Sequence, residues 1–85
     1  MAVDLLYFAW VREAIGRDGD RIDPPVEVAT VGDLLDWLAA RDPAYARAFA
    51  DRGRLRAAVD QAFVPIDHPI AGAREIAIFP PVTGG

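Results

Sequence analysis

The sequence contains no cysteine and no lysine among its 85 residues. Without cysteine the chain can form no disulfide, no thiolate metal site and no cysteine nucleophile. Its nine cationic residues are all arginine, against 13 acidic residues, which gives a net charge of −4. Because the arginines form no basic run, the chain lacks the charge pattern with which proteins contact nucleic-acid phosphates. We therefore expect no nucleic-acid partner.

Long apolar segments are missing as well. No apolar run approaches the roughly 20 residues that cross a bilayer. The N-terminal segment carries Asp4 early and lacks the basic start of a signal peptide. We expect a soluble, cytoplasmic protein that does not contact membranes. The length predicts one domain with a thin core and little room for an internal active site, which favours a carrier, adaptor or subunit over a self-sufficient enzyme.

The apolar pattern predicts five strands. Pro24 and Pro25 interrupt the second strand, which is therefore expected at a sheet edge, because proline cannot donate to a strand ladder. The first strand is apolar on both faces and is expected inside the sheet. The five strands are expected at residues 3–10, 21–28, 55–60, 63–64 and 74–79.

Helical spacing predicts one main helix and two shorter segments. Thr30 is a good N-cap, and apolar residues follow it at i, i+3, i+4 and i+7 until the helix ends near Asp42. Short helical segments are expected at 11–15 and after Pro43. This order of elements predicts an α+β domain over residues 1–79, in which one main helix packs across one face of a mixed sheet.

The last six residues differ from the rest of the chain. They are Pro80, Pro81, Val82, Thr83, Gly84 and Gly85. The two prolines favour an extended stem, and a Gly-Gly end lets a main chain pass through a narrow channel. Six extended residues span at most about 20 Å. We therefore interpret residues 80–85 as a flexible tail that is inserted into another protein; the alternative is a frayed end without function.

The chemistry of such a tail depends on Gly85. Its carboxylate is ionised at pH 7 and is a poor electrophile, so it must first become an acyl-phosphate or acyl-adenylate. The chain has no Gly-rich phosphate loop, nucleophile or lysine for this step, so a second protein must supply the ATP chemistry. An activated Gly85 can then accept sulfur and become a thiocarboxylate. We expect no cofactor or metal bound by the chain itself, and no catalysis by the chain alone.

Four other residues are candidates for a partner interface. Phe8, Phe63 and Phe79 are expected on the sheet face away from the helix, where an uncovered apolar patch usually marks a partner site; ordinary core packing is the alternative. Arg74 and the arginines at 52, 54 and 56 are candidates for docking an acidic partner, or for a solvated face. His68, in an Asp-His-Pro turn, has no partners for catalysis or metal binding and is interpreted as surface turn.

The chain resembles the small subunits of molybdopterin synthase, which are ubiquitin-like β-grasp sulfur carriers, over nearly its whole length. The matching segments are Phe8-Ala9 with Arg12-Glu13 and Gly16, Thr30 with Leu34 and Leu38, residues 58–61 and 67–69, and the most specific one, residues 79–85. Two departures stand out. Asp60 replaces a usual Asn, and Arg74 lies where an acidic turn is usual, which reverses a charge near the expected docking surface.

The resemblance implies a β-grasp fold and a sulfur carrier in molybdenum cofactor biosynthesis. An adenylating enzyme related to ubiquitin-activating enzymes is expected to use Mg-ATP to form the Gly85 adenylate, and a sulfurtransferase route to supply sulfur. The thiocarboxylate is then expected to enter the large synthase subunit and donate sulfur to precursor Z, which forms the molybdopterin dithiolene within a heterotetramer. The alternatives are a sulfur carrier for thiamin, thiolated tRNA or cysteine synthesis, a ubiquitin-like protein modifier, and an interaction module with an inert tail.

Overall fold

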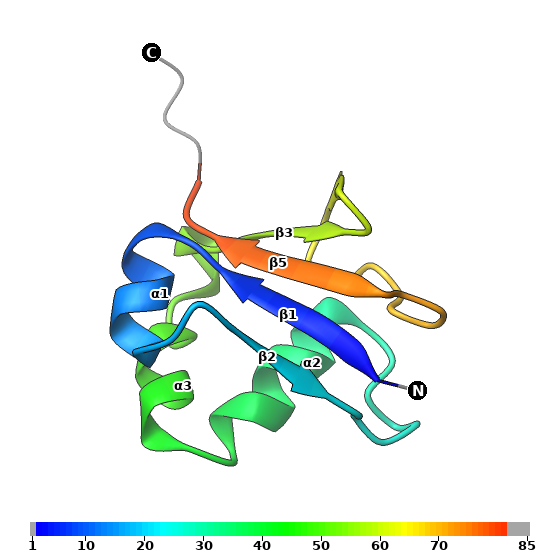
Figure 1. Ribbon diagram of the computed structural model, residues 1–85, viewed down its shortest axis with the longest axis horizontal. Coiled ribbons are helices and arrows are strands. Elements are labelled where there is room, and N and C mark those ends of the chain that lie inside the picture. Colours follow the sequence, from blue (N-terminus) through cyan, green and yellow to red (C-terminus); the bar gives the residue numbers. More distant parts are fainter. Residues whose placement is uncertain (1, 82–85) are drawn as a thin grey trace.

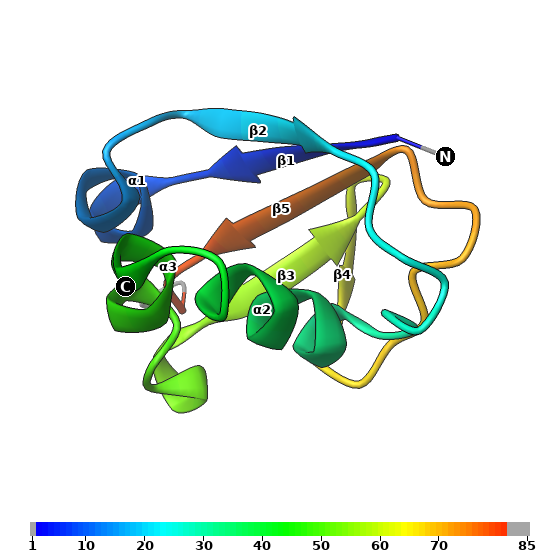
Figure 2. The same ribbon diagram turned by 90° about the horizontal axis from the view of Figure 1, so that it is seen from below.

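The computed structural model describes residues 2–81, which form a five-stranded mixed sheet with helices along one face (Figures 1 and 2). The elements are β1 (Val3–Tyr7), α1 (Ala9–Ile15), β2 (Gly19–Ile22), α2 (Val31–Ala39), α3 (Pro43–Ala48), the 3₁₀ helix η1 (Arg52–Arg54), β3 (Arg56–Val59), β4 (Ala62–Val64) and β5 (Glu75–Phe79). The strand order is β2-β1-β5-β3-β4, with β1 parallel to β5 and the other pairs antiparallel. The predicted α+β architecture is confirmed.

The core lies between the sheet and the helices. Helix α2 runs along one face of the sheet (Figure 2). Alternation along β1 and β5 turns every second side chain toward that face, and the apolar stripe of α2 is buried. Side chains from these three elements that are 4% exposed or less are Val3, Leu5, Tyr7, Val31, Leu34, Leu35, Leu38, Ile76 and Ile78. The single apolar stripe predicted for the main helix is therefore the surface that covers the sheet.

Two predicted strands differ from the structure by more than one residue at an end. The first ends at Tyr7 rather than Trp10, because Ala9 has a left-handed conformation (φ 54°) and the chain enters α1 directly. The second begins at Gly19 and ends at Ile22, so the prolines follow the strand instead of interrupting it. Its predicted place at the sheet edge is confirmed.

Helix α2 begins where the sequence predicts. Thr30 Oγ1 accepts the N–H of Asp33 (3.1 Å), and the Asp33 carboxylate accepts the N–H of Thr30 (3.2 Å). This capping box and a hydrogen bond from Val31 N–H to His68 O (3.0 Å) provide acceptors for backbone N–H groups that have no partner within the first turn of the helix. The helix ends at Ala39, earlier than predicted. Asp42 lies outside it in an extended conformation (φ −155°, ψ 133°), which is favoured for the residue before a proline, and it caps α3 instead.

A partly buried polar cluster joins the edge of the sheet to α3. One carboxylate oxygen of Asp20 accepts Oη–H bonds from Tyr7 (2.8 Å) and Tyr45 (2.5 Å), and the other accepts a bond from Arg17 (2.6 Å). Burial opposes ionisation of Asp20, but the bonds from both tyrosines and Arg17 outweigh it and lower the pKa of this carboxyl. Burial and the bond to Asp20 raise the pKa of both tyrosines. The cluster therefore contains one carboxylate and two neutral phenols at neutral pH.

We expect Asp20→Asn to lower the free energy of unfolding by about 1.5–3 kcal/mol at pH 7, the usual contribution of hydrogen bonds to a charged group. Because folding lowers the Asp20 pKa, the stabilisation is present above the unfolded value of about 3.9 and is lost as the pH falls through the folded value. In urea unfolding, the difference between wild type and variant should therefore shrink below about pH 4. Asp18→Asn, at an exposed neighbouring carboxylate, is the matched control. A difference that stays constant down to pH 3 would contradict the proposed ionisation.

Candidate functional site on the open face of the sheet

The C-terminal strand β5 lies in the middle of the sheet, between β1 and β3. It pairs along both edges, and Phe79 is its last residue. Pro80 and Pro81 follow, half-buried and without regular secondary structure. The predicted tail residues Val82, Thr83, Gly84 and Gly85 lie outside the described residues. The last residues that the structure describes thus follow a strand that is paired along both of its edges (Figure 1).

The sheet face away from the helices carries an apolar hollow beside this point. Strand register aligns Leu6 with Ala77, Ala77 with Ala58, and Ala58 with Phe63, which makes one row across four strands. The two alanines lower the middle of the row, and larger side chains stand around them. We call this feature the aromatic hollow, of about 370 Å³; its lining consists of Leu6, Phe8, Ala58, Gln61, Phe63, Glu75, Ala77 and Phe79.

The three predicted interface phenylalanines all line the aromatic hollow. Phe8 is 47% exposed and Phe63 is 79% exposed, so neither is an ordinary core residue. The Phe63 and Phe79 rings lie 5.5 Å apart and are tilted by 45°. Phe8 is held at the end of β1 by its own N–H, which donates to Ile78 O (3.2 Å). The structure therefore brings the three rings together beside the root of the tail; their role in binding a partner stays a prediction.

The two departures from the family pattern meet at the far rim of the aromatic hollow. Asp60 Oδ1 accepts the backbone N–H groups of Arg74 (2.9 Å) and Glu75 (3.0 Å). Asp60 and Gln61 have positive φ values of 49° and 71°, as a type I′ turn between paired strands requires. The Asp60 side chain thus ties the β3–β4 turn to the start of β5. An asparagine offers the same acceptor oxygen, so this departure leaves the link unchanged.

The other arginines of the predicted docking patch make contacts within the fold. Arg52 pairs with Asp36 (2.5 Å). The Arg54 guanidinium lies over the Trp10 ring at 4.7 Å from its centroid, and Arg56 donates to main-chain carbonyls of η1 and the following residue. Arg74 is exposed and lies next to Asp60 and Gln61, outside the lining of the aromatic hollow. The four arginines therefore do not form one patch.

The aromatic hollow is suited to docking and offers little chemistry of its own. Its lining includes one carboxylate, Glu75, and one amide, Gln61. Within residues 2–81 no group of three His, Asp or Glu side chains could hold a metal ion. In the same part of the chain, no helix combines the length and apolar character needed to cross a membrane.

Comparisons with known proteins agree with this geometry. A ThiS family model matches residues 5–85. The "Molybdopterin synthase sulfur carrier subunit" of Escherichia coli is 42% identical over 83 residues, which cover 98% of this chain and 99% of that protein. "Small archaeal modifier protein 1" of Haloferax volcanii is 36% identical over 83 residues, which cover 92% of this chain and 94% of that protein.

Solved structures share the fold. The crystal structure of SAMP1 from Haloferax volcanii superposes with a TM-score of 0.73 at 32% identity, over 100% of both chains. A chain in the complex of subunits 1 and 2 of the molybdopterin-converting factor from Helicobacter pylori has a TM-score of 0.63 at 17% identity, again over 100% of both chains, and shows the fold alone. The predicted ubiquitin-like β-grasp fold, with its main helix across one face of a mixed sheet, is confirmed.

We expect Asp60→Ala to lower the free energy of unfolding by about 2–3 kcal/mol, because it leaves two N–H groups without their acceptor and places alanine in a left-handed turn. Asp60→Asn keeps the acceptor oxygen and a residue type that tolerates the left-handed conformation, so it should cost less than about 1 kcal/mol. Asp60→Gly keeps the turn and loses the acceptor, so it should fall between the two. Equal urea midpoints for the Asn and Ala variants would show that the link to β5 contributes nothing.

Proposed function

The chain belongs to the ThiS family, and on that basis we propose that it is the sulfur carrier subunit of a molybdopterin synthase. The similarity to a carrier subunit of that name extends over nearly the whole length of both proteins. The observation that carries the proposal is the path of β5, a central strand that leads through two prolines into a Gly-Gly end. A carrier needs this combination, because the reactive group must be mobile while its origin is fixed.

The reaction that we propose takes place at Gly85. Its carboxylate oxygen attacks the α-phosphorus of ATP on an adenylating partner and displaces pyrophosphate. The terminal sulfur of a sulfurtransferase persulfide then attacks the acyl carbon, and AMP leaves with the electron pair of the broken bond. A thiol reductant cleaves the S–S bond of the resulting acyl disulfide and releases the thiocarboxylate.

In the large synthase subunit the thiocarboxylate sulfur attacks an electrophilic carbon of precursor Z. Water then cleaves the acyl–sulfur bond, which leaves the sulfur on precursor Z and returns Gly85 to a carboxylate. The adenylating partner binds the Mg-ATP, and the tail supplies the Gly85 acyl group and carries it into the partner.

The aromatic hollow is the surface with which the carrier docks on the large subunit in this proposal. Phe8, Phe63 and Phe79 stand beside the root of the tail, so a partner that covers them also receives the tail. Their exposed ring area offers the binding energy that a flexible tail cannot supply, since ordering the tail costs conformational entropy. Arg74, at the edge of this surface, is placed to contact an acidic side chain of the partner.

A second candidate function is modification of other proteins. It is favoured by the similarity to "Small archaeal modifier protein 1". An activated Gly85 would then be attacked by a lysine amine of a target protein, which forms an amide and releases AMP. The chain has no lysine, so it could not form side-chain-linked polymers of itself. The two functions share the activation step and differ in the nucleophile that follows.

We expect incubation with the adenylating enzyme, Mg-ATP and a sulfurtransferase with its sulfur source to replace one oxygen of the chain by sulfur. Intact-mass and fragment-ion analysis should place the change on Gly85. A chain that lacks Gly84 and Gly85 is the control and should stay unchanged. No mass change with an enzyme shown to be active would contradict the carrier proposal. Amide-linked products on added proteins would favour the modifier.

Ala77→Leu tests the docking surface. The larger side chain fills the floor of the aromatic hollow, and overfilling a packed surface costs about 1–3 kcal/mol. We expect binding to the large synthase subunit, measured by calorimetry, to weaken about tenfold or more. The urea midpoint of the free chain should change little, because the side chain points away from the core. Ala14→Leu, on the exposed side of α1, is the control, and equal affinities for the two variants would exclude this surface.

A further inference from the structure

The structure contains a second apolar surface, at the end of the sheet away from the tail. We propose that this surface binds a short protein segment in which branched aliphatic side chains are flanked by basic ones. The inference goes beyond the proposed function, because it uses no residue of the tail or of the aromatic hollow. We call the feature the distal cleft; it lies between the β2–α2 loop (residues 23–30) and the β4–β5 loop (residues 65–74).

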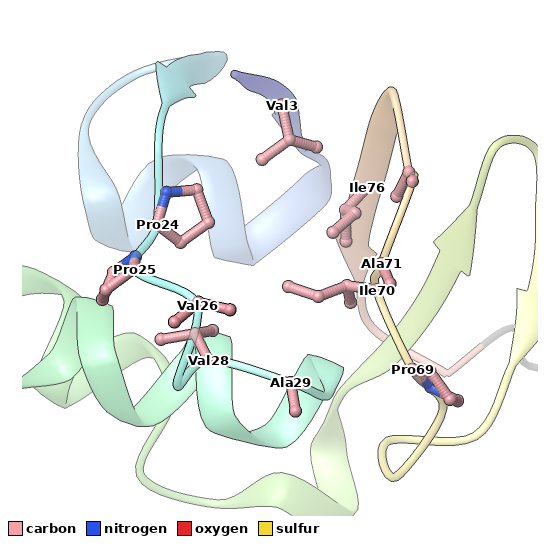
Figure 3. Close-up of a pocket in the computed structure, with 12 residues that line it drawn as sticks. Val3, Pro24, Pro25, Val26, Val28, Ala29, Pro69, Ile70, Ala71 and Ile76 are labelled. Carbon is pink, nitrogen blue, oxygen red and sulfur yellow. The ribbon is translucent and has the colours of Figure 1, made fainter. Parts of the chain in front are cut away.

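The distal cleft is a preformed hollow of about 370 Å³, within the usual range of ligand pockets. Figure 3 shows Pro24 and Val28 on one side and Ile70 pointing toward them from the other, with Val3 and Ile76 above them in this view. The lining is entirely apolar apart from main chain: Val3, Pro24, Pro25, Val26, Val28, Ala29, Pro69, Ile70, Ala71, Gly72, Ala73 and Ile76. Its chemistry therefore favours aliphatic side chains.

Main-chain hydrogen bonds hold the two walls together. Ile70 N–H donates to Ala29 O (3.0 Å), and Thr30 and Pro69 form an isolated bridge between the two loops. Within the second loop, Ala73 N–H donates to Ile70 O (3.0 Å). A cleft with walls fixed in this way loses little conformational entropy when it binds a ligand.

The exposure of Val26 shows that the distal cleft is an open apolar surface and not a packing defect inside the core. Among the described residues, the large apolar side chains that are exposed are Phe8, Phe63 and Val26. The first two line the aromatic hollow, and Val26, at 92% exposed, lines the distal cleft. Contiguous exposed apolar surface on a small protein usually marks an interaction site, and here the neighbouring Ala29, Pro69 and Ala71 side chains are exposed too.

The charges beside the cleft indicate which segment it fits. Glu27 on one loop and Asp67 on the other are exposed, and neither has an ion-pair partner among residues 2–81. Arg74, the cation of the second loop, lines a different hollow with Asp60. Basic side chains beside an aliphatic anchor would complement these carboxylates.

The same charges disfavour two other occupants. A second copy of the chain in a symmetric contact would bring its own acidic loops against Glu27 and Asp67. An anionic lipid surface would be repelled in the same way.

The distal cleft lies at the opposite end of the central strands from the tail. The parallel strands β1 and β5 begin at the distal cleft and end beside the tail. A segment bound here would therefore leave the tail and the aromatic hollow free for another partner.

The test is a ¹H–¹⁵N NMR titration of the full chain with the peptide acetyl-Arg-Val-Ile-Arg-amide. We expect chemical-shift changes confined to residues 24–29 and 69–73, and binding that weakens as salt is added. The control peptides acetyl-Glu-Val-Ile-Glu-amide and acetyl-Arg-Gly-Gly-Arg-amide should bind at least about fivefold more weakly, since one loses the charge complement and the other the aliphatic anchor.

Variants of the chain separate the contribution of the carboxylates to binding from that of the apolar cleft. Glu27→Gln combined with Asp67→Asn should weaken the first peptide about fivefold and remove most of the salt dependence. Glu13→Gln, which changes an exposed carboxylate on α1, should have no effect. Ala71→Phe should occlude the cleft and abolish the shifts. Absence of shifts at saturating peptide, shifts centred on the aromatic hollow, or cleft shifts that follow protein concentration without peptide would each overturn the proposal.

Discussion

The pairing of β5 on both of its edges is the constraint on which the rest of the structure depends. Because β5 is parallel to β1 and antiparallel to β3, it must lie in the middle of the sheet, although it is the last strand of the chain. The end of this strand is the root of the tail and the edge of the aromatic hollow. Its beginning is the floor of the distal cleft. One strand therefore separates two surfaces and keeps the tail at a fixed origin.

The small size of the domain leaves one face of the sheet uncovered. The helices bury a single side of the strands, so the outward row of Leu6, Ala77, Ala58 and Phe63 has no layer above it. Small residues in the middle of that row and aromatic residues around it make a hollow rather than a flat surface. A domain with a second helical layer would have used these side chains for its core. Here they stay on the open face, where a partner could contact them.

Two carboxylates hold the parts of the fold that hydrophobic packing reaches least. Asp20 binds the edge strand β2 to β1 and α3 through Tyr7 and Tyr45. Asp60 binds the β3–β4 turn to the first residues of β5. Both act as acceptors for groups from distant parts of the chain, and both lie outside the apolar core. Edge strands and turns of a thin domain gain order from such bonds, because they bury too little apolar surface to be fixed by packing alone.

The sequence by itself determined the features that depend on neighbouring residues. These are the cap and apolar stripe of α2 and the edge position of β2 next to its prolines. The chemistry of the Pro-Pro and Gly-Gly end stays a prediction. It also predicted that Phe8, Phe63 and Phe79 share the open face, because alternation along strands is local. Only the tertiary structure decided that Ala9 ends β1, that Asp20 joins two tyrosines, and that Val26 and Ile70 line one cleft. Those outcomes depend on strand order and on loop contacts between residues that are far apart in the chain. A local pattern of side chains does not specify which distant residues will meet.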